Sequence, residues 1–183
     1  MATDVVEVLT NETVELLQAL IRNRCVNDGT RASGHEDRSA RLLRDELEGS
    51  GVDQQMFELL PGRSSLVARW AGTDPSAPAL CLMGHTDVVP VSPEGWRHDP
   101  FGGELIDGEV WGRGAVDMLN LTASMTTVFR HLVTSGRRYP GDIIYFAVAD
   151  EEAGGRWGAA PLVENNWDIL HCEYVLTEFG GIP

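Results

Sequence analysis

The sequence contains no lysine, and all 14 of its basic residues are arginine. The absence of lysine excludes enzymes that depend on a lysine nucleophile or a lysine Schiff base. Positive charge is scarce as well, because the arginines stand against 28 acidic residues and the formal net charge is −14. Binding to nucleic acid backbones and to anionic membrane surfaces depends on basic residues, so the sequence predicts neither nucleic acid nor membrane as a partner.

Cysteines are few and long apolar runs are missing. Cys25, Cys81 and Cys172 are odd in number, widely spaced and free of any CxxC pair, which predicts buried or partly buried free thiols in a reducing compartment. No apolar stretch approaches the roughly 20 residues that a membrane-spanning helix needs. Residues 1–15 are acidic and do not resemble a secretory signal. We therefore expect a cytoplasmic protein.

The pattern of apolar residues predicts a single α/β domain. Three runs are apolar without alternation, as strands covered on both faces are: 79–83, 143–149 and 174–176. Shorter strands are predicted at 54–59 and 65–70, a hairpin at 104–111, and helices at 11–24, 35–48, 117–135 and 157–165. Strands that alternate with helices in this way predict a mostly parallel mixed sheet flanked by helices.

Acidic or imidazole side chains follow each of the three apolar runs. The first run is followed by His85 and Asp87, the second by Glu151 and Glu152, and the third by Glu178. In open α/β sheets the ligand site lies beyond the carboxyl ends of the strands, so we expect these side chains to meet there. Each motif taken alone is more often a turn or a cap, and only their combination indicates a site.

Asp117 adds a further carboxylate, in a glycine-rich turn that opens a predicted helix. The helix dipole favours a carboxylate at that position, so Asp117 alone would indicate only a cap. The G-x-G at residues 112–114 is not a nucleotide-binding loop, because Asp117 occupies the place of the third glycine and no strand feeds the turn directly.

One histidine with several carboxylates is the ligand set of one or two divalent metals of the zinc kind. A pair of metals bridged by a carboxylate activates water and polarises a carbonyl, and a further carboxylate can act as general base. Other hydrolase motifs are absent: His35-Glu36 has no second histidine at position 39, and there is no G-x-S-x-G. The sequence therefore predicts a metal-dependent hydrolytic site.

Four segments, in this order along the chain, carry a family resemblance: G-H-T-D-V-V, G-R-G-A-V-D-M, A-D-E-E-A-G-G and L-T-E. The series resembles the metallopeptidase family of aminoacylase, succinyl-diaminopimelate desuccinylase, acetylornithine deacetylase and glutamate carboxypeptidase. Residues 96–101 also resemble that family's W-x-x-D-P-F segment, and the match spans residues 14–181. One departure is Leu119, where the family often has lysine.

The resemblance implies a zinc-exopeptidase-like fold and a role for each ligand candidate. His85 and Glu178 would bind the first metal, Asp117 would bridge both metals, and Glu152 would bind the second. The implied cofactor is zinc, with cobalt or manganese as alternatives.

The resemblance also implies the chemistry. Asp87 would orient His85, and Glu151 would be the general base and proton shuttle. The peptide bond from Asp117 to Met118 is often cis in this family. The implied substrate is an N-acyl amino acid or a small peptide, cleaved at an amide bond next to a free carboxylate.

Members of the family also carry a lid and dimerisation domain and a late histidine that binds the second metal. We expect residues 1–183 to be the N-terminal portion of the catalytic domain, truncated before the lid. The second metal site would then be incomplete, the chain would be weakly active or inactive, and a homodimer would require the missing lid. The alternatives are a non-catalytic metal-binding or interaction fragment and a related two-metal aminopeptidase.

Overall fold

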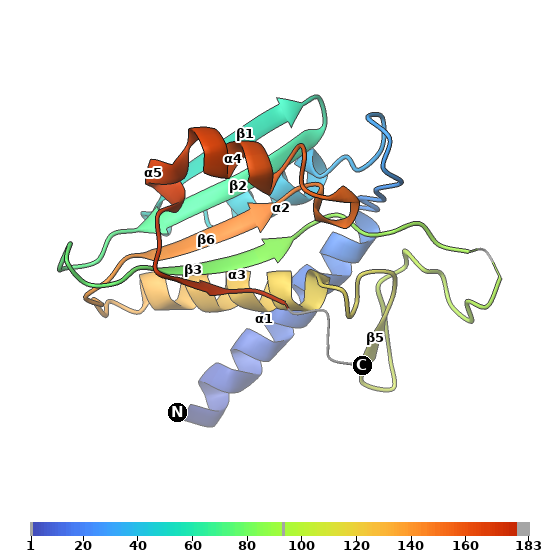
Figure 1. The fold of residues 1–183 in the computed structure, drawn as a ribbon. Coiled ribbons are helices and arrows are strands. Elements are labelled where there is room, and N and C mark those ends of the chain that lie inside the picture. Colours follow the sequence, from blue (N-terminus) through green and yellow to red (C-terminus); the bar gives the residue numbers. More distant parts are fainter. Residues whose placement is uncertain (1, 93, 179–183) are drawn as a thin grey trace, which may run out of the picture.

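The computed structural model describes residues 2–92 and 94–178, whose elements are drawn in Figure 1. The helices are α1 (Ala2–Arg22), α2 (Asp37–Glu46), α3 (Leu119–Thr134), α4 (Ala159–Asn165) and α5 (Trp167–Leu170), with a 3-10 turn at Glu151–Ala153. The strands are β1 (Asp53–Leu60), β2 (Arg63–Trp70), β3 (Leu80–His85), β4 (Glu104–Ile106), β5 (Glu109–Trp111), β6 (Ile143–Val148) and β7 (Tyr174–Leu176). The predicted strands and the hairpin at 104–111 are confirmed, with small shifts at their ends.

A five-stranded mixed sheet, in the order β1-β2-β6-β3-β7, forms the centre of the domain. The pairs β1–β2 and β2–β6 are antiparallel, whereas β3 is parallel to both β6 and β7. The mixed α/β architecture predicted from the sequence is confirmed. Because β3, β6 and β7 run in the same direction, their carboxyl ends lie together along one border of the sheet. We call this border, which runs across the ends of the strands, the carboxyl edge.

Helices cover both faces of the sheet (Figure 1). On one face α1, α2 and α3 form the larger core, in which Leu20, Leu43 and Phe129 are fully buried. On the other face α4 and α5 pack through Leu162 and Leu170. All six residues of β6 are buried between these layers, as its uninterrupted apolar sequence predicts. No helix within residues 2–92 and 94–178 is long and apolar enough to cross a membrane.

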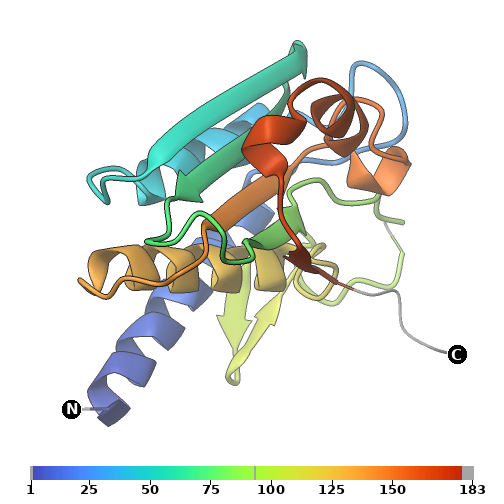
Figure 2. The same ribbon diagram turned by 60° about the vertical axis from the view of Figure 1, so that its left-hand side comes forward.

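The first helix begins earlier than expected, at Ala2 instead of Asn11. Its early turns extend past the sheet (Figure 2), so Val5, Val6 and Val8 remain exposed. The buried apolar face of the helix begins only later in its sequence. The short helix α5 was also not predicted from the sequence.

Strand β7 is less covered than predicted. Tyr174, Val175 and Leu176 are 62, 55 and 53% exposed, so the expectation that this strand is covered on both faces is wrong in the described part of the chain. The physical reason is its position, because within residues 2–92 and 94–178 β7 is an edge strand of the sheet and pairs with β3 alone.

Candidate metal centre

The residues predicted for the site come from separate elements and meet at the carboxyl edge. His85 is the last residue of β3 and pairs with Val148, the last residue of β6. The chain then turns, so that Glu151 and Glu152 follow directly on β6, and Glu178 lies just beyond β7. Asp117 precedes α3, and its peptide bond to Met118 is cis, in agreement with the family resemblance.

The imidazole of His85 is the centre of the cluster. Its side chain is 1% exposed, and its Nε2 lies 3.1 Å from Oδ1 of Asp117, 3.3 Å from Oε1 of Glu178 and 3.8 Å from Oε2 of Glu151. Two sets of donor atoms lie within 4.8 Å of one another: His85 with Asp117 and Glu152, and His85 with Glu151 and Glu178. One nitrogen and several carboxylate oxygens at this spacing fit a divalent metal.

The other ring nitrogen of His85 faces Asp87. Nδ1 lies 2.9 Å from the backbone carbonyl oxygen of Asp87 and 3.6 Å from its carboxylate Oδ1. The nearer partner is therefore the main-chain carbonyl of Asp87, and its carboxylate lies further away. A proton on Nδ1 donated to this carbonyl leaves the lone pair of Nε2 directed at the acidic cluster, as metal binding requires.

The carboxylate of Asp87 instead holds the turn after β6. It is fully buried and accepts the backbone N–H groups of Glu151 and Glu152, at 3.2 and 3.1 Å. It also accepts the side-chain amide of Asn27 at 2.8 Å. Asp87 thus ties the end of β3 to the turn that carries the two glutamates.

The acidic groups of the cluster disfavour one another's ionisation. Burial raises the pKa of Glu152 and of Glu178, and the neighbouring carboxylate of Asp117 raises both further, against the opposing effect of His85. Burial lowers the pKa of His85, but the charges of Asp87, Glu151 and Glu178 and the hydrogen bond to the Asp87 backbone together raise it, and the net pKa is raised. Acids crowded in this way are stabilised as anions by a bound cation, which is the electrostatic condition for a metal site.

The acidic triplet 150–152 is divided by the fold. Glu151 and Glu152 lie at the carboxyl edge, whereas Asp150 points inward and is 2.7 Å from the guanidinium of Arg63. The basic residue that pairs with this triplet is therefore Arg63, which lies 87 positions earlier in the sequence. Arg63 opens β2, whose sequence R-S-S-L-V-A-R-W contains a second arginine, so no feature of the sequence singles out Arg63 as this partner.

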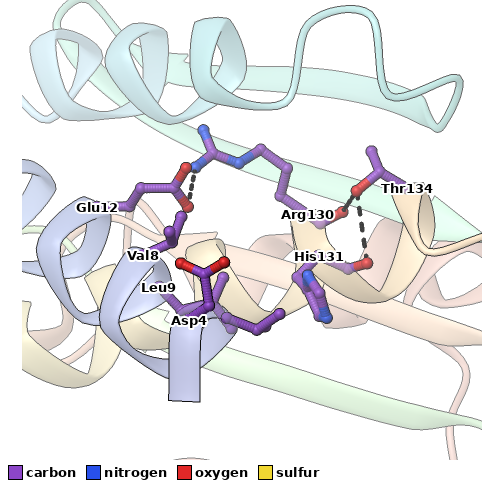
Figure 3. Close-up of a pocket in the computed structure, with 8 residues that line it drawn as sticks. Asp4, Val8, Leu9, Glu12, Arg130, His131 and Thr134 are labelled. Atoms are coloured by element: carbon purple, nitrogen blue, oxygen red, sulfur yellow. Dashed lines mark hydrogen bonds and ion pairs between the residues drawn. The ribbon is translucent and has the colours of Figure 1, made fainter. Parts of the chain in front are cut away.

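Two hollows have similar volumes but are lined by different kinds of residue. One of about 330 Å³ lies beside the cluster and is lined by Met83, Met118, Thr177 and Glu178, among others. Another of about 320 Å³ lies between α1 and α3 (Figure 3), where Arg130 is paired with Glu12 at 2.9 Å. Within the described residues the candidate metal-ligand sets all contain His85, so only the first hollow adjoins one.

A sheet that gathers one imidazole and several carboxylates at its carboxyl edge is typical of metal-dependent hydrolases. Comparison with known proteins gives the family. Residues 81–182 match the model of peptidase family M20/M25/M40, and the chain belongs to this family of hydrolytic metalloenzymes.

Sequence relatives include aminoacylase-1 of Sus scrofa, 36% identical over 139 residues, which cover 75% of this chain and 34% of the relative. Succinyl-diaminopimelate desuccinylase of Alkalilimnicola ehrlichii is 32% identical over 155 residues, covering 84% of this chain and 39% of the relative. The chain thus spans little more than a third of the length of these relatives.

Solved structures show the same fold. The M20 family metallo-carboxypeptidase Sso-CP2 from Sulfolobus solfataricus superposes with a TM-score of 0.73 at 20% identity, covering 95% of this chain and 38% of that one. Human carnosine dipeptidase 1 superposes with a TM-score of 0.71 at 24% identity, covering 96% of this chain and 40% of that one.

Proposed function

We propose that this chain forms the metal-binding part of a hydrolase that cleaves an amide or peptide bond next to a free carboxylate. The observation that carries the proposal is the approach of Asp117 and Glu178 to the same nitrogen of His85, at 3.1 and 3.3 Å. The names of the relatives, an aminoacylase and a desuccinylase, support an N-acyl amino acid or a small peptide as substrate.

In this proposal His85, Asp117, Glu152 and Glu178 hold zinc or a similar divalent metal. The bound metal would supply Lewis-acid polarisation of the scissile carbonyl and acidify a water molecule. Glu151 takes the proton of the attacking water and passes it to the leaving amine. Its side chain is 46% exposed at the edge of the cluster, which leaves it open to substrate, and a carboxylate in that position suits a general base.

We further propose that residues 1–183 correspond to the N-terminal portion of the catalytic domain. The match to 34 and 39% of the length of the two relatives is consistent with a portion of a longer domain. Because the family resemblance implies a further histidine for the second metal, we expect one tight zinc site in this chain and only slow hydrolysis.

The test is zinc-dependent release of amino acid from an N-acetyl amino acid by the purified chain, with the methyl ester of that substrate as the control for the free carboxylate. We expect slow release that is lost in the ester and in the E151Q variant. Release that persists in E151Q would contradict the proposed role of Glu151. Tight zinc binding without any release would instead favour a non-catalytic metal-binding function.

A further inference from the structure

Arg63 is a charged residue enclosed in the protein interior. It is the first residue of β2, and its side chain is 1% exposed. A buried guanidinium is costly unless it is paired and hydrogen-bonded, so its partners indicate why it is there. Those partners are two carboxylates that are equally buried, Glu36 and Asp150.

The guanidinium spans these two carboxylates. Its Nη2 donates to Oε1 of Glu36 at 2.8 Å and to Oδ1 of Asp150 at 2.7 Å. Its Nε lies 2.7 Å from Oε2 of Glu36, where the two groups form an ion pair but are not aligned for a hydrogen bond. Its Nη1 donates a hydrogen bond to the carbonyl of Thr30 at 3.4 Å. A planar fork can reach both acids at once, whereas a lysine ammonium, a compact point charge, matches this geometry less well.

Asp150 adopts a backbone conformation that needs support. Its φ is 65°, in the left-handed region that a residue with a side chain rarely occupies. Its carboxylate accepts three hydrogen bonds, from Arg63, from Asn27 at 3.0 Å and from the backbone N–H of Trp157 at 2.8 Å. Its own N–H donates to Glu36 at 3.2 Å. The buried network therefore fixes the first residue of the turn that carries the glutamates.

The same network reaches the carboxylate that holds the rest of this turn. The side-chain nitrogen of Asn27 donates to both Asp150 and Asp87, at 3.0 and 2.8 Å. Asp87 in turn accepts the backbone N–H groups of Glu151 and Glu152. A continuous chain of hydrogen bonds thus runs from Arg63 through two acids and one amide to the backbone at the carboxyl edge.

Gly34 allows the loop before α2 to pass over the guanidinium. A Cβ atom at this position would lie 2.5 Å from Nε of Arg63 and 2.5 Å from Oε2 of Glu36. The φ of Gly34 is +89°, which also favours glycine. Main chain and side chains therefore enclose the ion pair closely, which keeps water away from it.

We propose that Arg63 is a positioning residue of the metal centre, which sets the geometry of Glu151 and Glu152 through Asp150 and Asn27. Among the described residues the polar contacts of its guanidinium go only to Thr30, Glu36 and Asp150, so it acts on the metal ligands indirectly. The expected effect of Arg63 on metal affinity rests on the proposed function, whereas its effect on the position of the turn does not.

The test compares R63K with R69K in the full chain. Arg69 lies on the same strand and also pairs with an acid, Asp142 at 2.6 Å, but that pair is partly exposed and away from the cluster. Partners that orient metal ligands change metal affinity by about 10- to 100-fold when altered. We expect a zinc Kd raised about tenfold in R63K and unchanged in R69K, by calorimetric titration of variants that show wild-type circular dichroism. A folded R63K with wild-type zinc affinity would overturn the proposal.

A second measurement uses the metal-free chain, so that the positioning role is tested apart from the metal function. The backbone amide resonances of Glu151 and Glu152 should shift in R63K and stay in place in R69K. If the wild-type chain binds no zinc, the proposed function fails while this comparison still tests the positioning. Amide positions in R63K that match the wild type would contradict it.

Discussion

Nε2 of His85 lies 3.1 Å from Oδ1 of Asp117, although the two residues are 32 positions apart and belong to different elements. The first ends a buried strand, and the second precedes a helix packed on the same sheet. Their approach gives an imidazole nitrogen and a carboxylate oxygen a spacing at which they could bind the same divalent metal. The centre is therefore assembled by the parallel part of the sheet together with α3.

The first prediction concerns His85, the residue common to both sets of candidate ligands. We expect H85A to weaken zinc binding by about 100-fold or more, since a direct ligand should contribute at least as much as the groups that orient it. The control is H131A, which removes an exposed histidine near the end of α3. Calorimetric zinc titration checks both variants, and equal zinc affinities would contradict the assignment.

The second prediction separates the general base from the ligands. In the proposed function Glu151 does not hold the metal, although one candidate set of donor atoms includes it. We expect E151Q to keep the zinc Kd of the wild type and E178Q to raise it by about tenfold or more. A loss of zinc affinity in E151Q as large as that in E178Q would show that Glu151 is a ligand in this chain.

Much of this centre could be predicted from the sequence because its residues follow apolar runs. The runs 79–83 and 143–149 are buried strands, and the polar residues after them lie at the carboxyl edge as expected. The roles of Asp150 and Arg63 could not be predicted, because they are 87 positions apart and their pairing depends on how β2 aligns with β6. Neighbouring acids in a sequence give no indication of which one turns inward.

The ends of the fold were also poorly predicted, for two physical reasons. The early turns of α1 carry exposed valines, so burial in the core does not mark the start of the helix at Ala2. A short apolar run such as 174–176 reads as a covered strand, yet the exposure of a strand depends on its place in the sheet. Both features are tertiary and do not follow from local sequence.

The third prediction concerns the close contact between β3 and α3. A Cβ atom at Gly84 would lie 2.6 Å from Oγ1 of Thr122, which donates to the carbonyl of His85 at 2.7 Å. We expect G84A to lower the free energy of unfolding by about 1–3 kcal/mol, the usual effect of overpacking a core. The measurement is urea unfolding of the metal-free chain.

The double variant G84A/T122A is the control for this steric explanation. Removing the hydroxyl of Thr122 relieves the clash, so the double variant should be more stable than the sum of the two single changes predicts. Strict additivity of the two changes would show that the contact is not the cause.

The fourth prediction is a dependence of stability on pH that belongs to Glu36. Burial raises the pKa of this carboxyl group from 4.5 to about 7, although hydrogen bonding to Arg63 opposes the shift. The folded state therefore binds a proton more tightly than the unfolded state between these values, so the contribution of Glu36 to stability falls as the pH rises from about 4.5 to 7. Relative to E36Q, the wild type should lose on the order of 3 kcal/mol across this window.

Urea unfolding at pH 5 and pH 8, with a chelator present, measures this difference. The control is E164Q, which changes an exposed glutamate on α4 and should show no pH-dependent difference from the wild type. Identical pH dependence in the wild type and E36Q would contradict the shifted ionisation of Glu36.

In the proposed function one imidazole and several carboxylates of this chain bind a divalent metal, and X-ray absorption at the zinc edge of the zinc-loaded chain measures this coordination. We expect only nitrogen and oxygen neighbours at about 2.0–2.2 Å, with the scattering pattern of a single imidazole that disappears in H85A. A sulfur neighbour at about 2.3 Å would instead place the metal at one of the cysteines and would contradict its binding by His85 and the carboxylates.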